Sequence, residues 1–199
     1  MRVLAAFLFS ITVVGSVAST ARAEAGGISA SGSLNLFPLG TFRAEFGDGS
    51  DSEPTQFAYG IGAQVDYHVT SNISIGLAPR YTLNVIPDNA DPNDDAATQL
   101  DLLVRAQYNH AVSPQLIAFG FLAPGYSIIM LPDDQGDFDN PAGLVIGFGA
   151  GGRYMINGSM FVQGELGYQV GFHGVTVMGM DLTFATNYLH IGAGIGSYF

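Results

Sequence analysis

The chain has 199 residues, of which 17 are acidic and only six are basic, so its formal net charge is −11. So acidic a chain is not expected to bind nucleic acid, whose phosphates require a basic surface. Hydrophobic residues make up 48% of the chain and charged residues 12%, about half the charged fraction of an ordinary soluble protein. Cysteine is absent, which excludes disulfides.

The N-terminal segment has the pattern of a secretory signal peptide. A positive charge at Arg2 precedes an apolar run over 3–14, and Ala-Arg-Ala occupies 21–23. The apolar run is too short for a helix that spans a bilayer. We therefore predict a signal peptide over 1–23, cleaved between Ala23 and Glu24, and a single mature domain over 24–199.

Short turns and longer polar stretches alternate along the mature chain. Residues typical of tight turns occupy 70–72, 113–115 and 157–159. Longer polar stretches lie at 47–56, 87–99, 131–142 and 176–186. The alternation predicts four hairpin units, over 27–69, 73–112, 116–156 and 160–199.

Apolar residues occupy every second position in most of the segments between these turns. The alternation is regular over 57–69, 73–85, 100–109 and 160–173. The first segment is irregular after Phe37, and 116–130 is apolar on both faces with Pro124 inside it, which predicts a bulge or a change of register there. We predict an all-β fold, a closed antiparallel eight-stranded up-and-down transmembrane β-barrel. The alternative is a secreted soluble barrel or sandwich, which would carry more charge on its exposed faces.

Aromatic residues on the apolar face recur near the strand ends. Tyr67, Tyr108 and Tyr154 precede the short turns. Phe57, Tyr59, Tyr81 and Phe172 lie toward the long stretches. Aromatic girdles at both membrane interfaces have this placement.

The last strand carries a resemblance to a known family. Residues 188–199 end on Phe199 and keep apolar residues at Leu189, Ile191, Ala193 and Ile195, although Ser197 interrupts the pattern. With the signal peptide and the eight-strand rhythm, the chain resembles the OmpA/OmpX-like outer-membrane barrels. The resemblance implies a monomer in the outer membrane of a Gram-negative-type bacterium, in contact with lipid and lipopolysaccharide. It also implies that Phe199 is read by the outer-membrane assembly machinery, that the short turns face the periplasm and that the acidic loops face outside.

Six charged residues fall on the face opposite the lipid and balance one another, three acids against three arginines: Asp66, Arg80, Asp101, Arg105, Arg153 and Glu165. Buried charges persist only when paired, and an eight-stranded lumen has room for side chains rather than a water column. We predict a salt-bridge network that plugs the lumen, with Arg153 and Glu165 as its first pair. The alternative is a gate that re-pairs to pass small ions.

Two polar stretches are crowded with aspartates, at Asp88, Asp91, Asp94 and Asp95 and at Asp133, Asp134, Asp137 and Asp139. Carboxylates could bind divalent cations weakly and bridge to lipopolysaccharide. The spacing does not match an EF-hand, because Phe138 stands where that loop requires glycine. We favour solvated acidic loops, with weak cation binding as the alternative.

His173 and His190 lie at similar distances from the centre of the last polar stretch, so we expect them to be cross-strand neighbours near the outer mouth of the lumen. No third ligand accompanies them, so no metal site and no cofactor are predicted. Ser127 and His173 correspond only faintly to the residues of lipid-modifying barrel enzymes. The sequence thus favours a non-enzymatic barrel that supports the envelope or presents acidic loops, with a narrow gated channel or a lipid A-modifying enzyme as alternatives.

Overall fold

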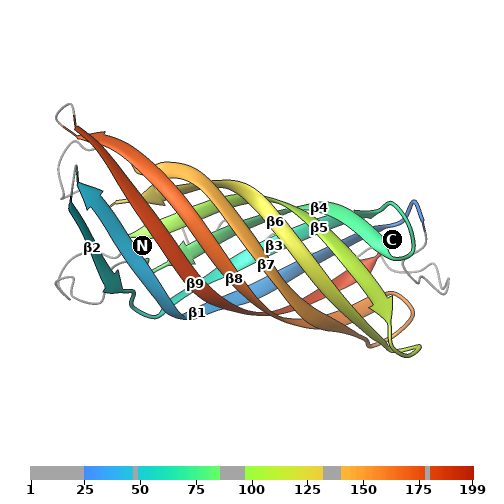
Figure 1. Cartoon of the computed structure of the whole chain (residues 1–199). Helices are drawn as coiled ribbons and strands as arrows, with labels where there is room; N and C mark the ends of the chain where they lie inside the picture. Colours follow the sequence, from blue (N-terminus) through green and yellow to red (C-terminus); the bar gives the residue numbers. More distant parts are fainter. Residues whose placement is uncertain (1–24, 47–48, 86–96, 132–139, 178–179) are drawn as a thin grey trace, which may run out of the picture.

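The structure is a computed structural model that describes residues 25–46, 49–85, 97–131, 140–177 and 180–199 (Figure 1). The predicted signal peptide and both aspartate clusters lie outside these residues, so those predictions remain predictions. In the described residues, no helix is long and apolar enough to cross a membrane.

One antiparallel sheet curls into a closed barrel. Its strands are β1 (Ile28–Phe46), β2 (Gly49–Pro54), β3 (Ala58–His68), β4 (Ile73–Leu83), β5 (Thr98–Ala111), β6 (Leu116–Met130), β7 (Ala142–Met155), β8 (Met160–Val177) and β9 (Met180–Tyr198). Strands β3 to β9 pair in chain order, and β1 pairs with both β3 and β9 to close the ring. The predicted eight-stranded barrel is confirmed, with β2 as an additional strand that pairs only with the end of β1 farthest from the short turns (Figure 1).

The three predicted short turns are confirmed, and at each of them a side-chain oxygen accepts hydrogen bonds from the turn backbone. Asn157 Oδ1 accepts hydrogen bonds from the backbone N–H groups of Ser159 and Met160, at 3.0 and 2.8 Å. Thr70 Oγ1 accepts one from the backbone N–H of Ile73 at 2.9 Å. Asparagine, serine and threonine are favoured in such turns because their side chains satisfy the turn backbone.

Two of the four long polar stretches are strand rather than loop. The stretch 47–56 contains β2, which pairs with β1 from Thr41↔Pro54 to Phe46↔Gly49. The stretch 176–186 lies in the β8–β9 hairpin, whose ladder continues to Val177↔Met180. In Figure 1 these strands extend the end of the barrel opposite the short turns, at the left of the view. In β2, polarity marks exposure on both faces and not a lack of regular structure, which is why the sequence pattern was misleading there.

The predicted irregularity at Pro124 is wrong. On the β5 side the register is the same before and after it, from Leu103↔Gly125 to Ala106↔Leu122, and on the β7 side Pro124 pairs in line with Ile146. Pro124 has no backbone N–H to donate, but the residue pairs before and after it keep the same register, so the strand tolerates it without a bulge. The register shift lies in β1 against β9, between Leu36 and Leu39, where the alternation in the sequence becomes irregular.

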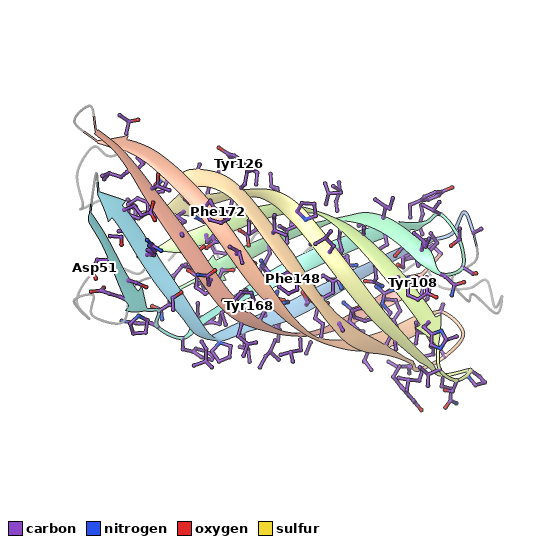
Figure 2. All side chains as sticks on the ribbon, in the orientation of Figure 1. Asp51, Tyr108, Tyr126, Phe148, Tyr168 and Phe172 are labelled. Carbon is purple, nitrogen blue, oxygen red and sulfur yellow. The ribbon has the colours of Figure 1, made fainter. Side chains whose placement is uncertain are left out.

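The barrel is apolar outside and polar inside, the reverse of a soluble protein. Leu77 and Leu144 on the outer face are 62% and 67% exposed. The three tyrosines next to the short turns are about half exposed, and Figure 2 shows Tyr108 near that end of the barrel. This arrangement excludes the soluble barrel or sandwich and is that of a transmembrane β-barrel.

Candidate functional site in the lumen

The lumen contains all six charged residues singled out in the sequence. Five are buried and the side chain of Glu165 is 9% exposed: Asp66, Arg80, Asp101, Arg105, Arg153 and Glu165. They form three ion pairs. Arg153 pairs with Asp66 at 3.2 Å, Arg105 with Glu165 at 2.8 Å, and Arg80 with Asp101 at 2.7 Å. The charges inside the described barrel are therefore neutralised pair by pair.

Two of the pairs connect strands that are not neighbours. Arg153 on β7 reaches across the lumen to Asp66 on β3, and Arg105 on β5 reaches Glu165 on β8. The expected pairing of Arg153 with Glu165 is wrong. The register places Arg153 opposite Gln163, which accepts a hydrogen bond from its Nε at 3.0 Å, and places Glu165 opposite a glycine. Long side chains in a narrow barrel can reach the far wall, so neighbours along the sheet need not be partners.

The layer nearest the short turns is centred on Arg153, whose exposure is 0%. Besides Asp66 and Gln163, its guanidinium donates to the Tyr198 hydroxyl at 3.2 Å and lies 4.8 Å from the centre of the Phe161 ring. A buried cation with this many partners fits a structural role.

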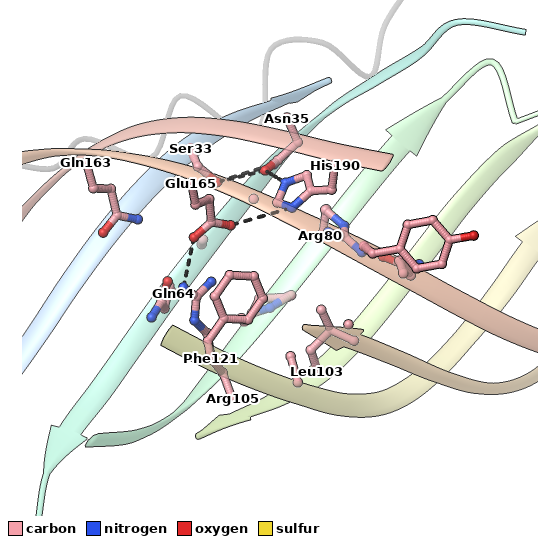
Figure 3. Close-up of a pocket in the computed structure, with 18 residues that line it drawn as sticks. Ser33, Asn35, Gln64, Arg80, Leu103, Arg105, Phe121, Gln163, Glu165 and His190 are labelled. Carbon is pink, nitrogen blue, oxygen red and sulfur yellow. Dashed lines mark hydrogen bonds and ion pairs between the residues drawn. The ribbon is translucent and has the colours of Figure 1, made fainter. Parts of the chain in front are cut away.

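The middle layer joins Arg105, Glu165 and His190 around a cavity of about 40 Å³ (Figure 3). The Arg105 guanidinium lies 3.8 Å from the centre of the Phe121 ring. His190 Nδ1 lies 3.7 Å from Glu165, and its Nε2 is hydrogen-bonded to Asn35 Oδ1 at 2.9 Å. The cavity has room for a few water molecules and not for a continuous water column.

The outer layer is centred on Arg80. It donates to Asp101 and also to Gln169 on β8, so it too spans the lumen. Phe37 packs under it, with its ring centre 5.0 Å from the guanidinium carbon, and makes an edge contact with Tyr188. The alternation in the sequence does not assign Phe37 to the lumen. The only signal in the sequence is that Phe37 stands where the irregular part of β1 begins.

The two histidines are not cross-strand neighbours. His173 pairs with Phe184, and His190 pairs with Gly167, well below it on β8. The expected symmetry was wrong because the β8–β9 ladder continues to Val177↔Met180, so its pairing is not centred on the polar stretch 176–186. Among the described residues, no group of three or more His, Asp or Glu side chains could hold a metal ion.

Phe199 follows the end of β9 and is 66% exposed. Its backbone N–H donates to the carbonyl of Ile28 at 2.8 Å, so the last residue is held at the seam between β9 and β1. Its role as an assembly signal stays a prediction.

No family profile matches the chain, and no curated protein sequence is significantly similar to it. Several solved structures of outer-membrane proteins superpose on the chain. The outer membrane protein OprG from Pseudomonas aeruginosa superposes with a TM-score of 0.59 at 14% identity, covering 88% of this chain and 97% of that one. The outer membrane protein AlkL superposes with a TM-score of 0.55 at 12% identity, covering 93% of this chain and 95% of that one. Neisserial surface protein A superposes with a TM-score of 0.50 at 13% identity, covering 86% of this chain and 97% of that one. The fold of outer-membrane barrels is thereby confirmed for this chain.

Proposed function

We propose that this chain is a non-enzymatic barrel of the outer membrane of a Gram-negative-type bacterium, which acts through its outer surface and not through its lumen. The observation that carries the proposal is the set of three buried ion pairs, two of which cross the lumen. Paired charges that brace opposite walls favour stability of the closed barrel over passage of solutes.

The acidic groups gather at the end of the barrel opposite the short turns. Asp51 in β2 lies there (Figure 2), as does the exposed pair of Arg43 and Glu45. In the sequence, the eight aspartates lie between β4 and β5 and between β6 and β7, and at this end of the barrel β4 and β6 end and β5 and β7 begin. An acidic outer end supports divalent-cation bridging to the phosphates of lipopolysaccharide as its mode of contact.

Replacement of all eight loop aspartates by asparagine is expected to abolish Mg²⁺-dependent binding of the protein to lipopolysaccharide vesicles, because the oxygen ligands lose their charge. Sedimentation with the vesicles measures this. The matched control is Glu165→Gln, which removes one buried lumen charge and leaves the outer end intact, so it should bind as the wild type does. Binding that survives the aspartate substitutions would contradict the proposal, as would open-channel steps of the wild type in planar bilayers.

A second candidate function is a gate for small ions, and one contact favours it. Glu165 lies beside the cavity between two basic side chains. Its carboxylate oxygens lie 2.8 Å from the Arg105 guanidinium and 3.7 Å from His190 Nδ1. A switch of Glu165 between them would alter the plug without unfolding it. If Glu165→Gln conducts in planar bilayers while the wild type does not, the gate is supported; if both are silent, the plug is static.

A further inference from the structure

One strand of the sheet has a free edge among the described residues. β2 pairs with β1 alone, at the end of the barrel opposite the short turns (Figure 1). Each of its residues is exposed except Glu53, which is partly buried. The other described strands have a neighbour on both sides, because the sheet closes on itself. A free strand edge presents a row of backbone donors and acceptors that can pair with another chain.

The free edge of β2 consists of the backbone groups of Ser50 and Ser52. The backbone N–H of Thr55, just after β2, donates to the carbonyl of Gly40 on β1 at 3.1 Å. Because hydrogen-bonded positions alternate along an antiparallel ladder, Asp51 also directs its backbone groups to β1, and the two serines direct theirs away from it. The Ser52 N–H agrees with this pattern, since it donates to Asp51 Oδ1 at 2.8 Å. The carboxylate thus occupies the donor that an added strand would need.

The charge at this corner of the sheet selects the kind of strand that can pair with β2. The β1–β2 ladder contains one base, Arg43, and three acids, Glu45, Asp51 and Glu53. A second copy of β2 would bring its own acids against Asp51, and like charges on paired strands are destabilising. A basic side chain opposite Asp51 would instead attract the carboxylate and leave the Ser52 N–H to a carbonyl of the added strand. The edge therefore disfavours a second copy and favours a basic strand.

We propose that the free edge of β2 binds an extended basic segment of another protein, which adds to the sheet as an antiparallel strand. Its residues opposite Ser50 and Ser52 exchange backbone hydrogen bonds with the edge. Its basic residues lie opposite Asp51, at the non-hydrogen-bonded positions where paired side chains are closest. The proposal rests on the proposed outer-surface function for the side of the membrane on which β2 lies. It adds a protein partner, bound by a strand that carries none of the eight loop aspartates.

Three synthetic heptapeptides separate the effect of charge from that of backbone pairing. The basic peptide alternates threonine with lysine, and the acidic peptide alternates threonine with glutamate. The third peptide has the basic sequence with methylated threonine nitrogens, so it keeps each lysine but cannot donate backbone hydrogen bonds from the positions opposite Ser50 and Ser52. Each peptide carries the same neutral fluorophore, and fluorescence anisotropy measures its binding to the folded barrel in nanodiscs of zwitterionic lipid.

The substitution Ser52→Pro tests the edge itself. It removes the N–H that points away from β1, and proline is tolerated on edge strands, so the β1–β2 ladder is expected to persist. Ser52→Thr is the matched control, because it keeps this N–H. Heat-modifiable migration checks that both variants fold as the wild type does.

We expect the wild type and Ser52→Thr to bind the basic peptide equally, and at least about tenfold more tightly than they bind the methylated or the acidic peptide. Ser52→Pro should bind the basic peptide at least about tenfold more weakly than the wild type. The proposal is overturned if the wild type does not bind the basic peptide, if the methylated peptide binds as tightly, or if Ser52→Pro leaves the affinity unchanged.

Self-association of the wild type that Ser52→Pro abolishes would also overturn the proposal, because it would assign the edge to a second copy. The proposed contact with lipopolysaccharide is decided separately, since the vesicle-binding measurement substitutes the eight loop aspartates and leaves β2 unchanged.

Discussion

Replacement of Arg153 by alanine is expected to lower the free energy of unfolding of the barrel by about 3–5 kcal/mol. The substitution leaves the Asp66 carboxylate at 1% exposure without the cation that now lies 3.2 Å away. It also removes the hydrogen bonds to Gln163 and Tyr198. Because the chain has no tryptophan, urea unfolding in detergent is best followed by far-ultraviolet circular dichroism.

The control for this prediction is a second arginine–carboxylate pair of the chain, which is exposed to solvent. Arg43 and Glu45 are 3.2 Å apart with side chains 50% and 49% exposed. Arg43→Ala should change the stability by only about 0–1 kcal/mol. If Arg153→Ala falls in the same range, the lumen network is not structural, and a simultaneous rise in ion conductance would identify it as a gate.

The second large effect is expected at the seam that closes the barrel. A Cβ atom at Gly196 on β9 would lie 2.4 Å from Phe161 Cζ and 2.5 Å from the backbone carbonyl oxygen of Ala30 on β1. The backbone oxygen cannot move without breaking the seam, so Gly196→Val should destabilise the barrel by about 3 kcal/mol or more. The measurement is the fraction of refolded protein that shows the heat-modifiable folded band.

Gly164 provides the matched control, since it lies on the neighbouring strand and faces outward. The nearest atom to a Cβ there is 4.0 Å away. Gly164→Val should therefore fold as well as the wild type or slightly better, because glycine weakens a strand interior. Equal folding yields for the two valine variants would show that the close approach at Gly196 does not limit closure.

The architecture was predictable from the sequence because membrane and lumen impose opposite demands on alternate residues. Over 57–69 and 160–173 this alternation is nearly unbroken, so faces and hairpins could be assigned without any tertiary information. The same alternation predicted the six lumen charges. Successive residues of a strand point to opposite faces, so an odd or even position decides whether a side chain faces lipid or lumen.

The partners of those charges were not predictable. Parity places Arg153 and Glu165 in the lumen, but their contacts depend on the register and on which wall a long side chain reaches. The positions of Phe37 and β2 likewise depend on the register shift in β1 and on pairing outside the membrane. The register shift and the pairing of β2 leave no periodic signal in the sequence, because neither depends on the alternation of lipid-facing and lumen-facing residues.

The structure therefore separates two parts of the molecule. The lumen from the short turns to Arg80 contains paired charges and aromatic rings. These contacts join opposite walls and stabilise the closed barrel. The end opposite the short turns carries exposed acidic residues such as Glu45 and Asp51, where contacts with other molecules are available. Function is accordingly expected at the outer end.

A closed barrel that spans the outer membrane is expected to show heat-modifiable migration when the protein is extracted from fractionated membranes. The unheated protein from the outer-membrane fraction should migrate faster than the boiled protein, because a closed barrel stays compact in detergent until it is heated. A protein found in the soluble fraction, with the same migration before and after boiling, would contradict the account.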